Sequence, residues 1–399
     1  MKYHTVRETA KQWNLSDRTV QQFCIDGRIP GAQKFGRSWA IPADAEKPQV
    51  PRIVRKRDAA QSFATGMLDN ANLMPLMNTP FPPGRCFASV EAMAPGPRRD
   101  IALAEYHYFT GKPEAAATEV ESYLTSADMG ARLSACLIYA YANLSIGEIQ
   151  CAKFALKELN ASLSAAGEQS AQFRTASAFV AVAGAVLLHL PLPAGVPDIQ
   201  SFLPLLPPGL RAFALYVYAH YRYLQGDYAA SAGIVEGALA MGAEAYPIPS
   251  IYLHLVAAMD CMSLKQADRA RVHLLSAWDL ARPDDLIEGF GEHHGLLGGM
   301  LEAVIKPAWP EDFKRIIDIT YRFSAGWRRV HNPVTGHDVA DDLTTTEFAA
   351  SMLADRGWTN QEIADHMHIS PNTVKRYIST ALEKLHIRHR QDLKQFMLR

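Results

Sequence analysis

Short polar and basic side chains gather on one face of a helix that the sequence predicts from Pro371 to about Leu385. An asparagine or an arginine can make two hydrogen bonds to one base edge in the DNA major groove, and a lysine binds phosphate. Contact with double-stranded DNA is therefore the chemistry that this face favours, and a merely solvated face is the alternative. The face consists of Asn372, Arg376, Ser379, Thr380 and Glu383, with Lys375 beside it.

The opposite face of the same helix is apolar, and the start of the helix is well specified. Ser370 can accept hydrogen bonds from the first turn, and Pro371 follows where its missing N–H costs nothing. Ile369 and Val374 have the spacing of a hydrophobic staple. The helix is expected to pack through one apolar stripe, made of Val374, Ile378, Ala381, Leu382 and Leu385.

Three further helices are predicted around this one. Thr359 to Glu362 form a capping box that starts a short helix, and only a tight turn at His368 separates it from the next. The sequence therefore predicts that the two helices form a helix-turn-helix. A second capping box, Thr344 to Glu347, starts an earlier helix, and residues 391–398 predict a last one with an apolar edge of Leu393, Phe396 and Met397.

The C-terminal segment, residues 343–399, resembles the LuxR-type DNA-binding domain. This resemblance implies that the second helix of the motif enters the major groove and that the last helix pairs two copies, through Leu393, Phe396 and Met397. It rests on Leu343-Thr344, Glu347, Gly357, Thr359-Asn360, Glu362-Ile363-Ala364, Ile369-Ser370, Thr373-Val374-Lys375, Lys384-Leu385 and Arg390. The DNA-binding residues expected here are Thr359, Asn360, Asn372, Thr373, Lys375, Arg376, Ser379, Thr380 and Lys384.

A similar pattern occurs at the N-terminal end, where Leu15 to Val20 repeats the staple, cap and threonine-valine sequence. Thr5 to Glu8 is a capping box, and 27–31 and 34–42 suggest two short strands around a basic turn. Residues 1–48 resemble the winged helix-turn-helix of excisionase and MerR-type proteins, although a protein-docking module of the same shape is the alternative. The DNA contacts expected here are Arg18, Gln21, Gln22, Arg28, Lys34 and Arg37.

Charge separates the two ends of the chain from its middle. Residues 1–58 hold 12 Lys and Arg against 6 Asp and Glu, a net charge of +6. From Pro371 onward the balance is 7 against 2, or +5, whereas residues 59–342 hold 20 against 29, or −9. Basic charge thus lies where the DNA-binding motifs are, and the middle is expected to repel nucleic acid.

The middle of the chain is predicted to be helical. Residues 49–98 are rich in proline and suggest a linker, and residues 99–330 contain helices paired around small turns at Gly111, Gly147 and Gly226. This region resembles tetratricopeptide repeats, whose stacked helix pairs form a concave surface suited to a peptide or a small ligand. We expect a sensor or oligomerisation module here.

Catalysis, metal binding and membrane insertion find no support in the sequence. No catalytic motif occurs, and Glu292-His293-His294 lacks the second ligand cluster of a metal site. The aromatic residues between Phe213 and Tyr223 are expected in the core. The apolar run from Ala176 to Leu190 is too short for a membrane helix, and five cysteines without CxxC pairing favour reduced thiols in a cytoplasm.

These observations predict a mainly α-helical, one-component transcription regulator that is not an enzyme and needs no cofactor. Its expected partners are promoter or operator DNA, a second copy of the chain and a small-molecule or peptide effector, with RNA polymerase as a further candidate. Two rival functions stay open. One is an excisionase-like architectural or recombination accessory protein, and the other is a helical protein-interaction scaffold.

Overall fold

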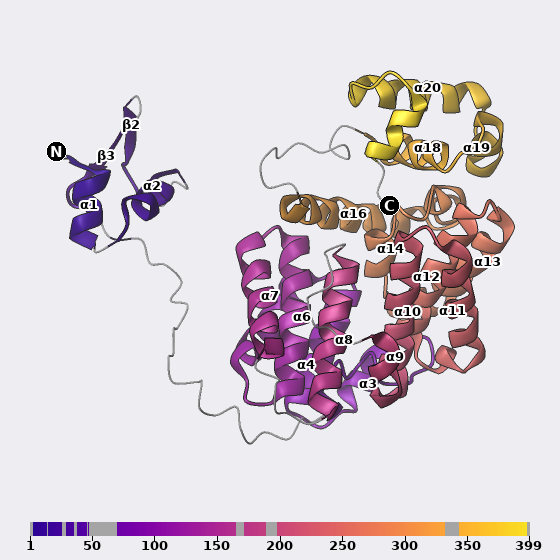
Figure 1. Ribbon diagram of the computed structural model, residues 1–399, viewed down its shortest axis with the longest axis horizontal. Coiled ribbons are helices and arrows are strands. Elements are labelled where there is room, and N and C mark those ends of the chain that lie inside the picture. Colours follow the sequence, from indigo (N-terminus) through magenta and orange to yellow (C-terminus); the bar gives the residue numbers. More distant parts are fainter. Residues whose placement is uncertain are drawn as a thin grey trace. The chain divides into compact units, whose positions relative to one another are not determined.

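The computed structural model describes residues 3–13, 15–25, 29–35, 38–45, 47, 70–164, 171–188, 198–331 and 343–396. The chain divides into two compact units, Met1–Thr65 and Gly66–Arg399. Figure 1 shows the elements of both units, and each unit is described by itself below.

The N-terminal unit combines two helices with a small antiparallel sheet. Its helices are α1 (Val6–Trp13) and α2 (Asp17–Ile25), and its strands are β1 (Tyr3–Thr5), β2 (Gln33–Phe35) and β3 (Ser38–Pro42) in the order β1-β3-β2. The sequence predicted a strand over 27–31, but the described part of that segment forms a turn that leads into β2. The third strand is β1, which pairs Tyr3 with Pro42. Its three residues are too few to show an alternating pattern.

A small apolar core holds this unit together. Trp13, Val20, Phe23 and Ile41 are buried, so both helices and the central strand contribute to it. The helix starts are those that the sequence predicted, since Glu8 accepts from the amide of Thr5 and Ser16 accepts from the amide of Thr19. An N-cap of this kind contributes about 1 kcal/mol.

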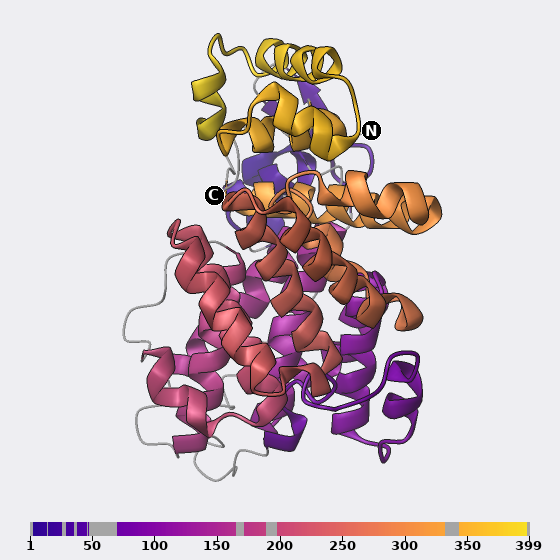
Figure 2. The ribbon, with the colours of Figure 1, turned by 90° about the vertical axis from the view of Figure 1, so that its right-hand side faces the viewer.

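The second unit is built mainly from antiparallel helix pairs. In each of four pairs, two consecutive helices pack against each other, and Figures 1 and 2 show their arrangement. The pairs are α4 (Pro97–Phe109) with α5 (Pro113–Val120), α6 (Met129–Ile146) with α7 (Ile149–Ser164), α10 (Pro208–Leu224) with α11 (Tyr228–Ala240), and α12 (Pro247–Ser263) with α13 (Ala267–Ala281). Between the second and third pairs lie α8 (Ala171–Leu187), α9 (Ile199–Phe202) and η5 (Leu203–Leu205).

The turns inside three of these pairs contain the glycines that the sequence singled out. Gly147 caps α6 with a φ of 90°, where a side chain would be strained, and its amide donates to the carbonyl of Asn143. Gly111 and Gly226 have similar positive φ values. In the turn between α12 and α13 the residue with a positive φ is Lys265. Paired helices are therefore present, while membership of the tetratricopeptide class stays a prediction.

After the fourth pair the chain forms shorter helices and then one long helix. These are η7 (Arg282–Asp284), α14 (Glu288–Glu292), the π-helix η8 (Leu301–Ile305), α15 (Lys306–Ala308) and α16 (Pro310–His331). The long helix α16 packs on α6 and α14. Among the described residues, no helix is long and apolar enough to cross a membrane, and α8 is a buried helix of this unit.

The sequence predicted a linker over residues 49–98, but residues 70–98 are part of the packed second unit. They form η2 (Asn70–Asn72) and α3 (Cys86–Glu91) and begin α4, and Leu73, Leu76 and Met77 are almost fully buried. Their prolines end and start short elements within a packed segment, so a high proline content did not mean an exposed connection here. Residues 49–69 lie outside the described residues.

The C-terminal part of this unit has the three helices that the sequence predicted. They are α18 (Thr345–Asp355), α19 (Asn360–Met367) and α20 (Pro371–Lys384). The predicted fourth helix is instead a 3-10 helix, η9 (Arg390–Gln395), which is shorter and begins one residue earlier. In the views of Figures 1 and 2 these helices lie at the end of α12 and α13, where Lys265 between the two helices contacts Gly357.

Candidate nucleic-acid interface

Local hydrogen bonds set the geometry of the helix-turn-helix. The hydroxyl of Thr359 accepts from the amide of Glu362, whose carboxylate accepts in return from the amide of Thr359. His368 ends α19 in the left-handed conformation, with a φ of 55°. Ser370 then caps α20 by accepting from the amide of Thr373 at 3.1 Å. Each bond involves neighbouring residues, which is why the sequence alone could predict it.

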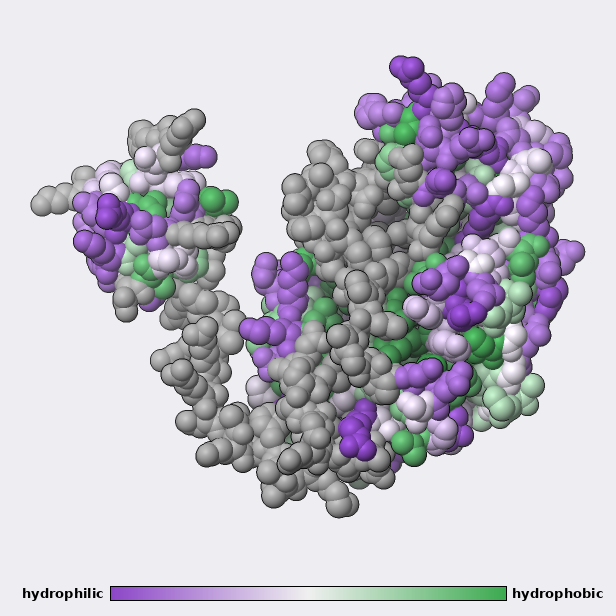
Figure 3. Space-filling view, viewed as in Figure 1, coloured by the Kyte–Doolittle hydropathy of each residue, from purple (hydrophilic) through white to green (hydrophobic). Residues whose placement is uncertain are grey.

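The two faces of α20 have the predicted roles. Val374, Ile378 and Ala381 are buried against the rest of the domain. Asn372, Lys375, Arg376 and Ser379 are exposed together on the outer face. The side of the domain visible in Figure 3 is largely hydrophilic. This arrangement leaves a polar, basic helix face open to a partner as large as a DNA duplex.

Other residues predicted to bind DNA are used within the domain. Lys384 forms an ion pair of 2.7 Å with Glu347, and Asn360 accepts a hydrogen bond of 2.7 Å from Arg390. The hydroxyl of Thr373 bonds to that of Ser370. Lys384 and Asn360 thus have structural partners that sequence spacing could not reveal, because those partners come from other helices. Thr380 is half-buried, and Thr359 is an exposed cap.

The predicted dimerisation residues do not form one exposed edge. Leu393 is fully buried in the hydrophobic core of its own unit, and Phe396 is partly buried against it. Leu393 is therefore already used for folding, which corrects its assignment to a pairing surface. Met397 lies outside the described residues.

Of the DNA-binding residues predicted in the N-terminal unit, the structure describes the side chains of Gln21 and Lys34. Gln21 of α2 and Lys34 of β2 are exposed, and the ammonium of Lys34 lies 6.0 Å from the ring centre of Trp39. Arg18 and Gln22 also belong to α2, but their side chains lie outside the described residues, as do Arg28 and Arg37. The two units nevertheless share a cap geometry, since Ser16 and Ser370 each hydrogen-bond the threonine three positions later.

A contact between α18 and the helix pairs was not predicted. Arg356, the residue after α18, donates to the hydroxyl of Tyr223 at 2.7 Å and to the carbonyl of Leu296 at 2.5 Å. Lys265 donates to the carbonyl of Gly357 at 2.9 Å. A methyl group added at Gly298 would lie 2.5 Å from the guanidinium of Arg356, so this glycine permits the close approach.

His366 of α19 takes part in the same contact. Burial lowers its pKa to about 4, although the ring hydrogen-bonds the backbone of Gly298, which acts to raise the pKa. The ring therefore stays neutral in a contact that already contains Arg356. The sequence did not predict the contact of Arg356 and His366, because an arginine and a histidine at helix ends are common surface residues.

Comparison with known proteins agrees with the geometry of this domain. Residues 341–397 match the family model of bacterial regulatory proteins, luxR family. This domain is a LuxR-family helix-turn-helix domain. The domain type indicates a DNA-binding transcriptional regulator, and it covers about one seventh of the chain. Neither a search of curated proteins nor a search of solved structures found a match.

The segment Glu292-His293-His294 directs its three side chains to different partners. Glu292 accepts from Tyr252, His293 bonds to the hydroxyl of Tyr216 at 2.9 Å, and His294 bonds to Glu302. Across the residues that the structure describes, no group of three or more metal-type ligands could hold an ion. The three side chains connect helices of the second unit to one another.

Proposed function

We propose that this chain is a sequence-specific, one-component transcriptional regulator that reads its operator with α20 of the LuxR-family domain. The observation that carries the proposal is the division of this helix into a buried apolar face and an open polar face. Asn372, Lys375 and Arg376 are exposed, and no hydrogen bond or ion pair uses their side chains among the residues of this domain that the structure describes. Their chemistry suits base edges and phosphates in the major groove.

Each of these side chains has a separate role in the proposal. Arg376 and Asn372 bind base edges bidentately, whereas Lys375 binds a phosphate. The guanidinium of Arg376 lies 5.5 Å from the ring centre of Tyr377, which restrains its position before DNA is bound. The N-terminal unit adds a second contact through its charge, and a homodimer at the promoter engages RNA polymerase.

The helix pairs act as the sensor in this proposal. What supports this role is the short segment that joins their interior to the DNA-binding domain. His293 is buried among aromatic side chains and Glu292 is partly buried beside it, and only three residues after His293 the carbonyl of Leu296 accepts from Arg356. A ligand that shifts the buried part of this segment alters the contact at Arg356.

Binding of the full chain to DNA tests the proposal. Fluorescence anisotropy on sequences selected from random DNA is expected to give tight, salt-dependent binding that Arg376→Ala weakens. Arg388→Ala is a matched control, because it removes the same charge from an exposed arginine of this domain that lies outside α20. Absence of any DNA binding at low salt would contradict the proposal and leave the interaction-scaffold function.

A genome-wide binding map separates regulation from the recombination function. Peaks centred on promoters are the expected result, because an operator must lie where transcription starts. Peaks confined to attachment sites would instead favour an excisionase-like architectural protein, which the resemblance of residues 1–48 suggests.

A further inference from the structure

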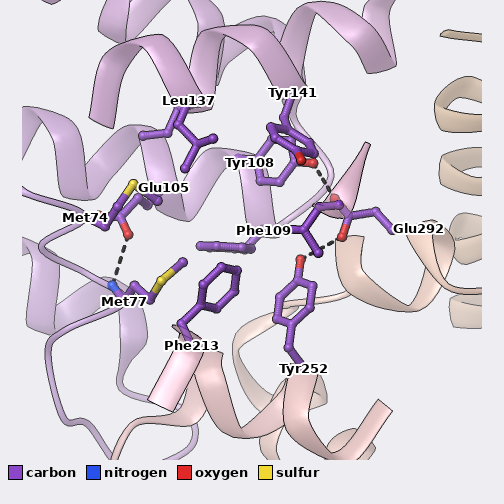
Figure 4. Close-up of a pocket in the computed structure, with 12 residues that line it drawn as sticks. Met74, Met77, Glu105, Tyr108, Phe109, Leu137, Tyr141, Phe213, Tyr252 and Glu292 are labelled. Atoms are coloured by element: carbon purple, nitrogen blue, oxygen red, sulfur yellow. Dashed lines mark hydrogen bonds between the residues drawn. The ribbon is translucent and has the colours of Figure 1, made fainter. Parts of the chain in front are cut away.

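A cavity of about 50 Å³ lies inside the second unit, between α4, α6, α10 and α12. Figure 4 shows the side chains that line it, most of which are aliphatic or aromatic. Met74, Met77, Leu137 and Phe213 are among them. The surface that these walls expose to the cavity is wholly apolar.

The two glutamates that line the cavity use their carboxyl groups elsewhere. Glu105 accepts from the amide of Met77 at 3.0 Å. Glu292 accepts from the hydroxyls of Tyr108 and Tyr252, and Figure 4 shows these bonds. Burial raises the pKa of both carboxyl groups, which favours their uncharged forms. These side chains therefore line the cavity with carbon atoms, and their polar atoms bind one another or the backbone.

The cavity is large enough for water but offers water no partner. A water molecule needs only about 10–15 Å³ of such space, but it also needs two to four polar partners. The apolar surface of this cavity supplies none. An alcohol, an amine or a carboxylate would likewise lose its hydration without a new hydrogen bond. An apolar molecule instead leaves water favourably and gains dispersion contacts with the walls.

We propose that this cavity binds a short neutral hydrocarbon of about two or three carbon atoms. An apolar cavity of about 150 Å³ accommodates benzene, and this one has roughly a third of that volume. The occupant packs against the rings of Phe109 and Phe213 and the side chains of Met74 and Met77. Methionine is unbranched and flexible, so these two walls adapt to the shape of the occupant.

The position of the cavity gives the hydrocarbon a role as effector, and this role rests on the proposed function. Tyr252 lines the cavity, and the centre of its ring lies 5.7 Å from that of His293. Three residues after His293, the carbonyl of Leu296 accepts from Arg356 of the DNA-binding domain. A hydrocarbon packed against Tyr252 restrains one end of the segment whose other end contacts that domain.

The direct test is NMR of the full chain with ¹³C-labelled methionine methyl groups, equilibrated with propane under pressure. Propane should shift the resonances of Met74 and Met77 saturably and leave that of Met241, which is 76% exposed, in place. Ethanol has the same number of non-hydrogen atoms and should bind at least about tenfold more weakly, because its hydroxyl would be buried without a hydrogen bond. No saturable shift with propane, or equal binding of ethanol, would overturn the proposal.

Two variants locate the binding site. Leu137→Phe places a larger side chain in the cavity and should abolish the propane-induced shifts of Met74 and Met77 without lowering the Tm. Leu137→Ala tests the same position without added bulk, since it enlarges the cavity and should let benzene bind saturably. Leu205→Phe, at a 52% exposed position of η5, is the matched control and should bind propane as wild type does. Propane-induced shifts in a folded Leu137→Phe chain, or no benzene binding by Leu137→Ala, would contradict the assignment.

A separate measurement keeps the ligand apart from the proposed function. Saturating propane should change the affinity of the full chain for its selected DNA sequence, and Leu137→Phe should bind this DNA without responding to propane. Specific DNA binding without methionine shifts would overturn the ligand assignment alone. Saturable shifts in a chain whose DNA affinity does not respond would overturn the effector role. Saturable shifts in a chain that binds no DNA would support the cavity and overturn the proposed function.

Discussion

The guanidinium of Arg356, just after α18, donates a hydrogen bond of 2.7 Å to the hydroxyl of Tyr223 in α10. The same group donates to the carbonyl of Leu296, so one side chain holds the DNA-binding domain both to a helix pair and to the segment between α14 and η8. Tyr223 itself is close to a buried ring, because the centre of its ring lies 6.2 Å from that of His220. A change inside the helix pairs therefore has a direct route to the DNA-binding domain.

Replacing Arg356 should loosen this contact without unfolding the domain. In Arg356→Met, the carbonyl of Leu296 and the hydroxyl of Tyr223 lose their donor, so amide hydrogen exchange should accelerate at residues 297–300 and in α19. Mass spectrometry of the exchanged protein measures this. Arg388→Met, which changes an exposed arginine of the same domain, is the control. Equal exchange in both variants would contradict a role for Arg356 in the contact.

Lys375 and Lys384 should behave oppositely although both lie on α20. Lys375 is exposed, so Lys375→Met should lower the salt slope of DNA binding by about one unit and leave stability unchanged. Lys384→Met breaks the ion pair with Glu347 and should cost about 1 kcal/mol of unfolding free energy, with little change in the salt slope. Anisotropy titrations against salt and urea unfolding give the two quantities.

The buried carboxyl of Glu105 predicts a specific pH dependence. Burial raises its pKa from 4.5 to about 8, while hydrogen bonds from the amides of Leu76 and Met77 act to lower it. Between pH 4.5 and about 8, the carboxyl group of Glu105 therefore keeps its proton in the folded state and loses it in the unfolded state. Its contribution to stability is present below pH 4.5 and is lost as pH rises towards 8.

Urea unfolding of Glu105→Gln at several pH values measures that contribution. Glutamine has one acceptor oxygen and loses one of the two backbone bonds, so the variant should be less stable than wild type at pH 5. The difference should shrink as pH rises to 8, by at most a tenfold change in the folding equilibrium per pH unit. Glu91→Gln, at an exposed position of α3, should show no such trend. A constant difference for Glu105→Gln would show that the carboxyl does not titrate in this range.

The parts of the fold that depend on neighbouring residues could be predicted from the sequence. The caps at Thr344, Thr359 and Ser370 follow from side chains that bond within three positions, and all three helices begin there. The turn glycines Gly111 and Gly147 likewise follow from backbone strain, which is a local property.

The parts that depend on distant partners could not be predicted. Lys384 has the spacing of a DNA-binding residue, but Glu347 lies 37 positions away and neutralises it. Leu393 has the spacing of an exposed edge, but the short η9 turns it into the core. The partners of Glu292 could not be predicted for the same reason, since Tyr108 and Tyr252, which donate to its carboxylate, lie on other helices.

Pairing of two copies on DNA stays a prediction, with Phe396 as the described residue that can still contribute to it. A two-fold dimer should protect two half-sites about one helical turn, ~10 bp, or a multiple apart. Footprinting shows the spacing, and sedimentation at the same concentration shows the oligomeric state. One unpaired half-site together with a monomer in solution would contradict the dimer.

Selection from random DNA with wild type, Arg376→Ala and a chain lacking residues 1–48 tests most directly whether α20 reads the operator. Arg376→Ala should relax the recovered motif at one base pair and cost about 1–3 kcal/mol at the operator. The truncated chain should recover the same motif with lower affinity, because a segment with a net charge of +6 acts through phosphates whatever the bases are. If the truncation alone changed the motif while Arg376→Ala left it intact, the N-terminal unit would be the reader and α20 would not.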